Sequence, residues 1–299
     1  MAAAPTGPRA NPPAIAGVKR SFVEARGVRF HVTESGPANG RPVIALHGWP
    51  QHHWAYRDLL ADPPDGLRII VPDLPGYGWS GPAPHRWTKE DVAADVIALA
   101  DALGLDRFLL VGHDWGGFIG YLMVLGAPER IDGYLALNIA HPWQTPRTFT
   151  PHLWRFLLYQ PFVASIGVPL QLRTDYLEKV IFRMAAPTLD RDVVRVYTER
   201  FRDPVAARAA RDTYRTFLTR ELPAIARHGE RRRATVPIRA LFGEGDTAIS
   251  PALASERTAL ADDYTLEISG GGHFIVDERP DLVRDGLRSL AAETAAATG

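Results

Sequence analysis

A carboxylate lies between two glycines in the segment Phe108-Leu-Leu-Val-Gly-His-Asp-Trp-Gly-Gly117. The segment begins as a short apolar run, turns at the glycines around Asp114 and continues as an amphipathic stretch from Phe118 to Leu125. This is the G-x-S-x-G pattern of a nucleophile on a sharp strand-to-helix turn, with Asp in place of Ser. Gly112 and Gly116 permit the turn, and the helix N-terminus stabilises negative charge there. The same pattern also fits an Asp that merely caps a helix, so it needs support from other segments.

Two further side chains follow late apolar runs, in the order that a triad of nucleophile, acid and histidine requires. Leu241-Phe-Gly-Glu-Gly-Asp246 places an acid just past one run, and Gly271-Gly-His-Phe274 places a histidine past the next run. We therefore predict a catalytic triad of Asp114, Asp246 and His273.

A carboxylate nucleophile favours a particular kind of reaction. An aspartate with an ordinary pKa of about 4 is already ionised at neutral pH, so His273 is not needed to activate it. Asp114 can attack an electrophilic sp³ carbon, after which His273, oriented by Asp246, activates water against the resulting ester. Peptides and simple esters are poor substrates, because attack on them would give an anhydride. We predict the oxyanion hole for the second step at the backbone N–H groups of Trp49, within His47-Gly-Trp-Pro50, and of Trp115.

Short apolar runs bounded by turn residues predict the strands that hold these groups. Two lead-in strands, Phe22–Ala25 and Val28–Thr33, are joined through Gly27. The later runs are typical of parallel strands buried on both faces, namely Val43–Leu46, Leu67–Val71, Phe108–Val111, Tyr134–Ile139, Ile238–Phe242 and Tyr264–Ile268. Helical patterns alternate with them. The clearest helix spans Thr88–Leu103, begins with a capping box of Thr88 and Asp91 and stops at Gly104.

This alternation predicts an α/β fold, with a mostly parallel central sheet flanked by helices. The alternation fails between residues 141 and 227, where the sequence has helical periodicity but no convincing strand. We predict that residues 141–227 form a mainly helical lid, inserted between a first core part (18–140) and a second core part (228–299). Residues 1–17, rich in Ala and Pro, are predicted to be a flexible tail.

Composition narrows the class of protein further. The chain has 299 residues, 46% of them hydrophobic, and its 34 basic and 34 acidic side chains give a net charge of zero. We therefore expect no nucleic-acid or membrane partner, and interpret the run Arg231–Arg233 as a surface patch. There is no cysteine and no run of about 20 apolar residues, so we expect a soluble cytoplasmic protein. We expect no cofactor and no metal, since His52, His53 and His141 lack ligand partners at useful spacing.

From Ser21 to Leu290 the chain resembles the α/β-hydrolase branch that contains epoxide hydrolases and haloalkane dehalogenases. Gly112-His-Asp-Trp-Gly-Gly117 is similar to both groups. His47-Gly-Trp-Pro50, Asp73-Leu-Pro-Gly-Tyr-Gly-Trp-Ser80 and Gly272-His-Phe274 are closer to the epoxide-hydrolase forms. The resemblance implies cofactor-free opening of an epoxide to a diol, with a small apolar epoxide and water as reactants. It implies nothing about the oligomeric state.

The lid should distinguish an epoxide from a halide, because an epoxide oxygen needs a proton donor. Asp212-Thr-Tyr-Arg215 is similar to the lid segment in which epoxide hydrolases carry a ring-opening tyrosine, which implies that role for Tyr214. A second lid tyrosine is common in that family. Trp154 and Arg155 stand roughly where it would fall, so either Tyr159 or Tyr176 substitutes for it or Tyr214 acts alone. We therefore expect Trp154 and Tyr159 to contact the substrate.

Two alternatives remain open at this point. Trp115 and Trp154 together offer two indole N–H groups for a halide, as in a haloalkane dehalogenase. Trp49, however, stands where many dehalogenases carry Asn or Glu. The other alternative is a hydrolase-like binding protein without turnover, against which the intact set of Asp114, Asp246 and His273 argues.

Overall fold

The computed structural model describes residues 11, 13–255 and 260–296 of the chain. Most of the predicted N-terminal tail, residues 1–10 and 12, therefore lies outside the described residues.

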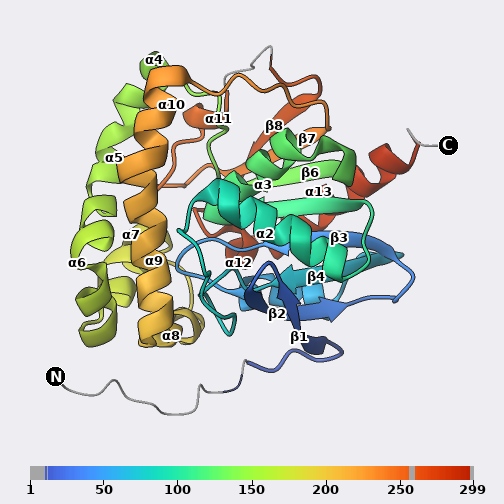
Figure 1. Cartoon of the computed structure of the whole chain (residues 1–299), viewed down its shortest axis with the longest axis horizontal. Helices are drawn as coiled ribbons and strands as arrows, with labels where there is room; N and C mark the ends of the chain where they lie inside the picture. Colours follow the sequence, from blue (N-terminus) through green and yellow to red (C-terminus); the bar gives the residue numbers. More distant parts are fainter. Residues whose placement is uncertain (1–10, 12, 256–259, 297–299) are drawn as a thin grey trace.

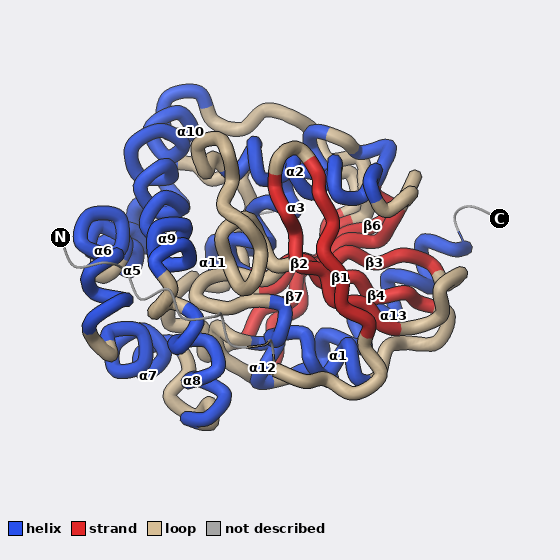
Figure 2. The backbone as a smooth tube through the Cα atoms, turned by 60° about the horizontal axis from the view of Figure 1, so that its bottom comes forward, coloured by secondary structure: helices blue, strands red, loops and turns tan. Residues whose placement is uncertain are grey.

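An eight-stranded sheet forms the centre of the protein, with the strand order β1-β2-β4-β3-β5-β6-β7-β8 (Figures 1 and 2). β1 and β2 form an antiparallel hairpin and β2 is antiparallel to β4, whereas all the other neighbours are parallel. The predicted mostly parallel α/β sheet is thus confirmed. The strands are β1 (Lys19–Ala25), β2 (Val28–Ser35), β3 (Arg41–Leu46), β4 (Leu67–Pro72), β5 (Phe108–His113), β6 (Ile131–Leu137), β7 (Ile238–Gly243) and β8 (Tyr264–Ser269).

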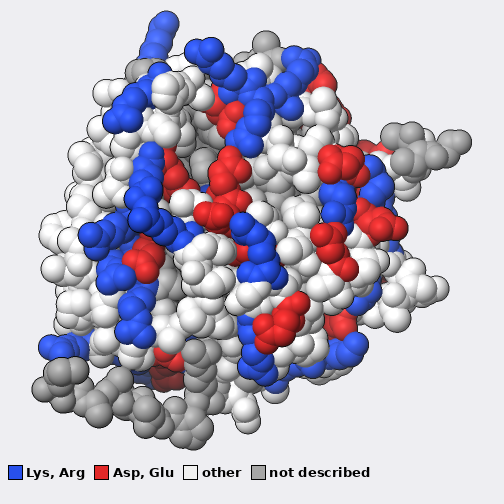
Figure 3. All heavy atoms as spheres, in the orientation of Figure 1, with Lys and Arg blue, Asp and Glu red and all other residues white. Residues whose placement is uncertain are grey.

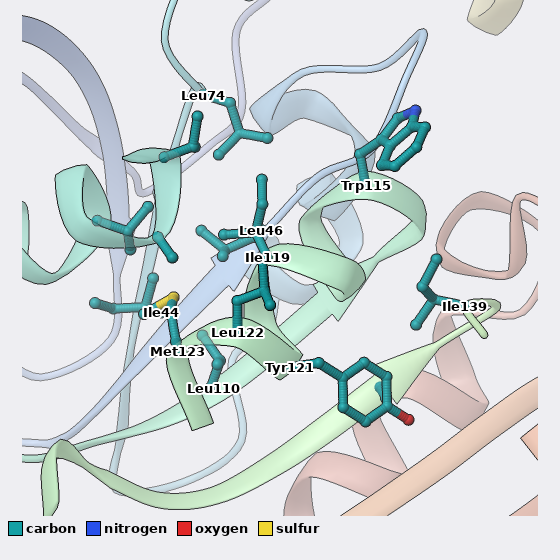
Figure 4. Close-up of a cluster of buried hydrophobic side chains, with 14 of the residues drawn as sticks. Ile44, Leu46, Leu74, Leu110, Trp115, Ile119, Tyr121, Leu122, Met123 and Ile139 are labelled. Carbon is teal, nitrogen blue, oxygen red and sulfur yellow. The ribbon is translucent and has the colours of Figure 1, made fainter. Parts of the chain in front are cut away.

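Helices cover both faces of the sheet, because the central strands are apolar on both faces. Ile44 and Leu110 pack with Ile119 of α3 in the cluster drawn in Figure 4. Their sequence neighbours Val43 and Leu109 pack on the opposite face, with helix α13. The helices of the core are α1 (Arg57–Ala61), α2 (Lys89–Ala102), α3 (Asp114–Gly126), α11 (Ala252–Ser255), α12 (Ile275–Glu278) and α13 (Pro280–Ala296), with 3₁₀ turns at His53–Tyr56 and Pro128–Arg130.

Helix α2 begins as the capping pattern predicts. The Thr88 side chain accepts a hydrogen bond from the backbone N–H of Asp91, and its hydroxyl donates to the Asp91 carboxylate at 2.6 Å. The helix ends before Gly104, which has φ +68° and so fits a left-handed C-terminal turn.

Strand β8 differs from its prediction. Its run Tyr264–Ile268 was expected to be buried on both faces, but its residues alternate between partly buried and exposed, and Ile268 is 51% exposed. The reason is its position at the edge of the described sheet, where β7 is its one neighbour. A short apolar run cannot by itself distinguish a central strand from an edge strand.

Between β6 and β7 the described chain forms helices and no sheet strand; in Figure 1 these helices stand to the left of the sheet. We call residues 146–228 the lid helices. Helix α6 packs along α9, and Val163 and Gly167 of α6 are buried. The lid helices are α4 (Pro146–Phe149), α5 (Leu153–Leu157), α6 (Gln160–Arg173), α7 (Arg183–Ala185), α8 (Arg191–Arg200), α9 (Pro204–Thr216) and α10 (Leu222–His228), with a 3₁₀ turn at Thr150–His152 and π-helical segments at Leu177–Phe182 and Phe217–Glu221.

The surface carries both signs of charge (Figure 3). Within the run Arg231–Arg233, Arg232 pairs with Glu230 and Glu90, both at 2.7 Å, and Arg233 pairs with Asp262. Among the described residues no helix combines the length and the apolar character needed to cross a membrane.

Candidate active site

Asp114 is the first residue of α3, directly after β5, and its φ of +49° is unusual for a residue with a side chain. Close packing around it explains the glycines. A Cβ atom added to Gly116 would lie 2.4 Å from the carbonyl oxygen of Leu46, and one added to Gly48 would lie 2.4 Å from Cβ of Asp114. The backbone of the β3 loop thus lies directly against this residue.

The predicted acid and histidine meet Asp114 at the carboxyl ends of the parallel strands. Asp246 follows β7 and His273 follows β8, and all three side chains are buried. Nδ1 of His273 lies 3.0 Å from Oδ2 of Asp246, and Nε2 of His273 lies 3.9 Å from Oδ1 of Asp114. The imidazole therefore stands between the two carboxylates, with one nitrogen toward each.

Backbone and side-chain donors hold Asp246 in place. Its Oδ1 accepts backbone N–H groups of Ala248 and Ile249, both at 2.8 Å. Its Oδ2 accepts the Asn138 amide at 2.7 Å. Asn138 directly follows β6 with φ +46°. The sequence analysis missed it, although a polar residue at the carboxyl end of a parallel strand is a usable signal.

These neighbours set the charge of the site. Burial alone would lower the pKa of His273, but the carboxylates of Asp246 and Asp114 raise it to about 9. Burial raises the pKa of Asp114, and this rise is opposed by the charge of His273 and by the backbone N–H groups of Trp49 and Trp115. In the free protein at neutral pH, His273 is therefore protonated and faces the Asp114 side chain.

The two backbone donors predicted as an oxyanion hole converge on Asp114. The N–H of Trp49 donates to Oδ2 of Asp114 at 2.9 Å, and the backbone N–H of Trp115 also lowers the pKa of this carboxylate. Trp49 lies in the loop after β3, and Trp115 is the second residue of α3. The donors are thus fixed by two neighbouring strands of the sheet.

Aromatic rings from the lid helices close over this carboxylate. Tyr214 of α9 is 1% exposed, and its ring lies edge-on to the rings of Trp49 and Trp115, with centroid distances of 5.1 and 5.3 Å. Tyr159, just before α6, stacks on Trp49 at 6.1 Å and lies 5.7 Å from the Tyr214 ring. Burial is the largest cause that raises the pKa of both phenols, and the negative charge of Asp114 raises it further. Both phenols therefore remain protonated.

A cavity of about 750 Å³ leads to Asp114. Trp115 and Tyr159 line it near the carboxylate, and much of the remaining wall is apolar, including Phe118, Phe149, Phe156, Phe217, Leu222 and Ile225. Trp154 does not belong to this wall, and its side chain is 57% exposed. Tyr176 is half-buried and does not line the cavity. Of the lid residues considered as substrate contacts or proton donors, Tyr159 therefore lines the cavity. Tyr214 is not part of this wall but packs against Tyr159, Trp49 and Trp115, whereas Trp154 and Tyr176 lie outside both the wall and this ring cluster in the described structure.

A second polar cluster contradicts the expectation that His53 has no partners for a metal site. Ligand atoms of His31, His53 and Asp73 lie within 4.8 Å of one another in the core. The Asp73 oxygens already bond to both imidazoles at 2.9 Å, and to the backbone N–H groups of His53 and Trp79. The spacing in the sequence did not reveal the cluster because Asp73 lies 20 positions from His53 and 42 from His31, and the pairing of β2 with β4 brings His31 to Asp73. We interpret it as a hydrogen-bond network that fixes the loop after β4.

The fold and this site place the protein among hydrolases: residues 41–280 match the family model described as the alpha/beta hydrolase fold, and the chain belongs to this family. The AB hydrolase superfamily protein YfhM of Bacillus subtilis is 28% identical over 89% of this chain and 96% of its own length. Epoxide hydrolase 4 of Mus musculus is 26% identical (92% and 81%), and haloalkane dehalogenase 2 of Mycobacterium tuberculosis H37Rv is 25% identical (88% and 91%). The structure of Cfl2 from Burkholderia cenocepacia aligns with a TM-score of 0.75 at 26% identity, over 91% of this chain and 95% of Cfl2.

Proposed function

We propose that this hydrolase opens an epoxide to a vicinal diol through an ester on Asp114. The observation that carries the proposal is the pair of buried, protonated phenols, Tyr214 and Tyr159, whose rings pack on Trp49 and on each other beside the Asp114 carboxylate. Attack by Oδ1 of Asp114 on an epoxide carbon breaks the ring C–O bond. One phenol donates its proton to the ring oxygen as the alkoxide forms, which is ordinary general-acid catalysis.

The second half of the reaction returns the enzyme to its starting state. His273 takes a proton from water, and the hydroxide attacks Cγ of Asp114, with Oδ2 in the hole made by Trp49 and Trp115. The C–O bond between Cγ and the substrate oxygen then breaks, and the departing alkoxide takes the proton held by His273. The proton of the new Asp114 carboxylic acid returns to the phenolate, so the diol leaves with the original Oδ1 and Asp114 keeps an oxygen from water. Asp246 orients His273 and stabilises its positive charge.

The proposed reaction also explains why His273 lies beside the Asp114 carboxylate. Ester formation removes the charge of Asp114, which is one of the causes that raise the pKa of His273. The pKa of His273 therefore falls once the ester has formed, and more of the imidazole is neutral when it must accept a proton from water.

Halide release remains the second candidate, because one relative is named haloalkane dehalogenase. Halide release requires N–H donors at the point where the halide leaves the substrate. From the sequence, the indole N–H groups of Trp115 and Trp154 were the candidates for this role. The exposed position of Trp154, away from the cavity wall, weighs against that pair. A binding protein without turnover would not need the converging acid, base and backbone donors.

Parallel turnover assays test the proposal. Diol formation from aryl and alkyl epoxides is compared with bromide release from bromoalkanes of similar size, and Asp114→Ala serves as the inactive control. We expect diol formation that depends on Asp114. Efficient bromide release with no diol formation would show that the protein acts as a haloalkane dehalogenase and not as an epoxide hydrolase. No turnover of either type would favour a binding protein.

A further inference from the structure

A lysine is completely buried beneath the lid helices, outside the groups used above. Lys89 is the first residue of α2, and its exposed fraction is 0%. Its Nζ donates to Oε2 of Glu221 at 2.6 Å, to the Thr216 hydroxyl at 3.4 Å and to the backbone carbonyl of Thr213. A buried ammonium group is costly unless it is paired and hydrogen-bonded, and here the partners all come from the region at the end of α9 and just after it.

The same ammonium group touches the aromatic rings at the site. Nζ lies 4.6 Å from the ring centroid of Trp115 and 5.3 Å from that of Phe217, both within the range of a cation–π interaction. Burial lowers the pKa of Lys89 to about 8, against the effect of Glu221, so the side chain is mostly charged at neutral pH. Lys89 thus connects a core helix, the lid and the ring beside the nucleophile.

Three further bonds attach this part of the lid to the core. The Tyr77 and Thr213 hydroxyls lie 2.8 Å apart, and the Thr216 hydroxyl donates to the carbonyl of Trp87 at 2.7 Å. The backbone N–H of Lys89 donates to the second oxygen of Glu221 at 2.6 Å. Tyr214 therefore lies in a helical turn that is held on both sides by contacts with the core.

We propose that Lys89, paired with Glu221, is a positioning residue that holds the phenol of Tyr214 at the correct place over Asp114. The Nζ bond to the carbonyl of Thr213 acts on the residue directly before Tyr214, so loss of the ammonium group removes one of the contacts that position the backbone carrying the phenol. The Tyr77 and Thr216 bonds remain and keep the turn folded on the core. The backbone N–H of Trp115 belongs to the elbow and is fixed by α3, so the water step does not depend on Lys89. This inference rests on the proposed epoxide reaction.

The test separates the two chemical steps in Lys89→Met, which keeps an unbranched side chain of similar length but removes the charge. Single-turnover experiments with excess enzyme follow formation of the Asp114 ester by intact-protein mass spectrometry, and then its decay. We expect ester formation to slow by about tenfold or more, because small displacements of a catalytic group are costly. Ester decay should stay within about twofold of the parent protein.

A double variant shows whether Lys89 acts through Tyr214. In a Tyr214→Phe background the proton donor is already absent, so Lys89→Met should slow ester formation by less than about twofold more. The matched control is Arg26→Met, since Arg26 pairs with Asp91 and Asp95 of the same helix and, within the described structure, makes its ion pairs there rather than with the lid helices. This control should leave both steps unchanged.

A purely structural role predicts different results. Equal slowing of both steps by Lys89→Met, or a full further tenfold loss in the Tyr214→Phe background, would overturn the proposal. If near-ultraviolet circular dichroism shows that Lys89→Met is misfolded, Glu221→Gln decides, with the same pattern expected at smaller size. Failure of the epoxide reaction itself would appear differently, as absence of ester formation in the unmodified protein.

Discussion

The backbone N–H of Trp49 donates a 2.9 Å hydrogen bond to Oδ2 of Asp114, so in the free protein the nucleophile's own carboxylate already occupies the predicted oxyanion hole. The other oxygen, Oδ1, lies 3.9 Å from Nε2 of His273. The two oxygens of this carboxylate thus have different surroundings, since one accepts a backbone N–H and the other faces the imidazole.

Water oxygen should enter the enzyme before it enters the product. One turnover in ¹⁸O-water with excess enzyme should label the peptide that contains Asp114, because water attacks Cγ of that residue. Peptide mass spectrometry measures the label, and enzyme incubated without substrate is the control. Label in the diol alone would mean that water attacks the substrate directly.

His273→Gln should block the second step and spare the first. Ester formation needs ionised Asp114 and a proton donor, so it does not need His273 at a pH above the raised pKa of Asp114. Ester decay needs the base at every pH. Intact-protein mass spectrometry should show a lasting adduct of substrate mass, and addition of Asp114→Ala should abolish it. If a verified substrate leaves no adduct, the role of His273 is not limited to the decay of the ester.

Tyr214→Phe should slow epoxide turnover by at least about tenfold, the low part of the usual range for a general acid because Tyr159 provides a second phenol. Tyr159→Phe should have a smaller effect, and the double variant a larger effect than either. Tyr176→Phe is the matched control, since Tyr176 is only half-buried and lies outside the described ring cluster of Trp49, Trp115, Tyr159 and Tyr214. Equal rates in all variants would remove the tyrosines from the mechanism.

The two steps should depend differently on pH. Ester formation needs ionised Asp114, so it should fall as the pH drops through the raised pKa of this residue. Ester decay needs neutral His273 and should therefore rise with pH. Its midpoint should lie below about 9, the pKa in the free protein, because the ester has removed the Asp114 charge. Pre-steady-state kinetics of each step, with an NMR titration of free His273, measures both; identical midpoints for decay and for free His273 would contradict the argument.

The sequence predicted the fold and the residues near strand ends, because short local patterns specify both. Asp114, Asp246 and His273 each stand in a glycine-containing turn after an apolar run, and the structure brings all three together. Asn138 and Lys89 were missed, since their roles depend on partners more than a hundred positions away.

The lid was harder to predict from sequence for a geometric reason. Counting residues placed Trp154 near the second tyrosine position, but α5 ends at Leu157 and the following turn directs Tyr159 inward while Trp154 stays outside. Packing of helices on the core decides which side of such a segment faces the cavity. A single sequence carries little information on that choice.

The strand order also has a consequence for the growing polypeptide. Asp114 and its glycine turn belong to the first half of the chain, whereas Asp246 and His273 follow β7 and β8, which complete one edge of the sheet. The chain is synthesised from its N-terminus, and domains generally fold as units. The turn that carries Asp114 therefore leaves the ribosome before the strands that position Asp246 and His273, and the three side chains can meet only after β8 has been synthesised.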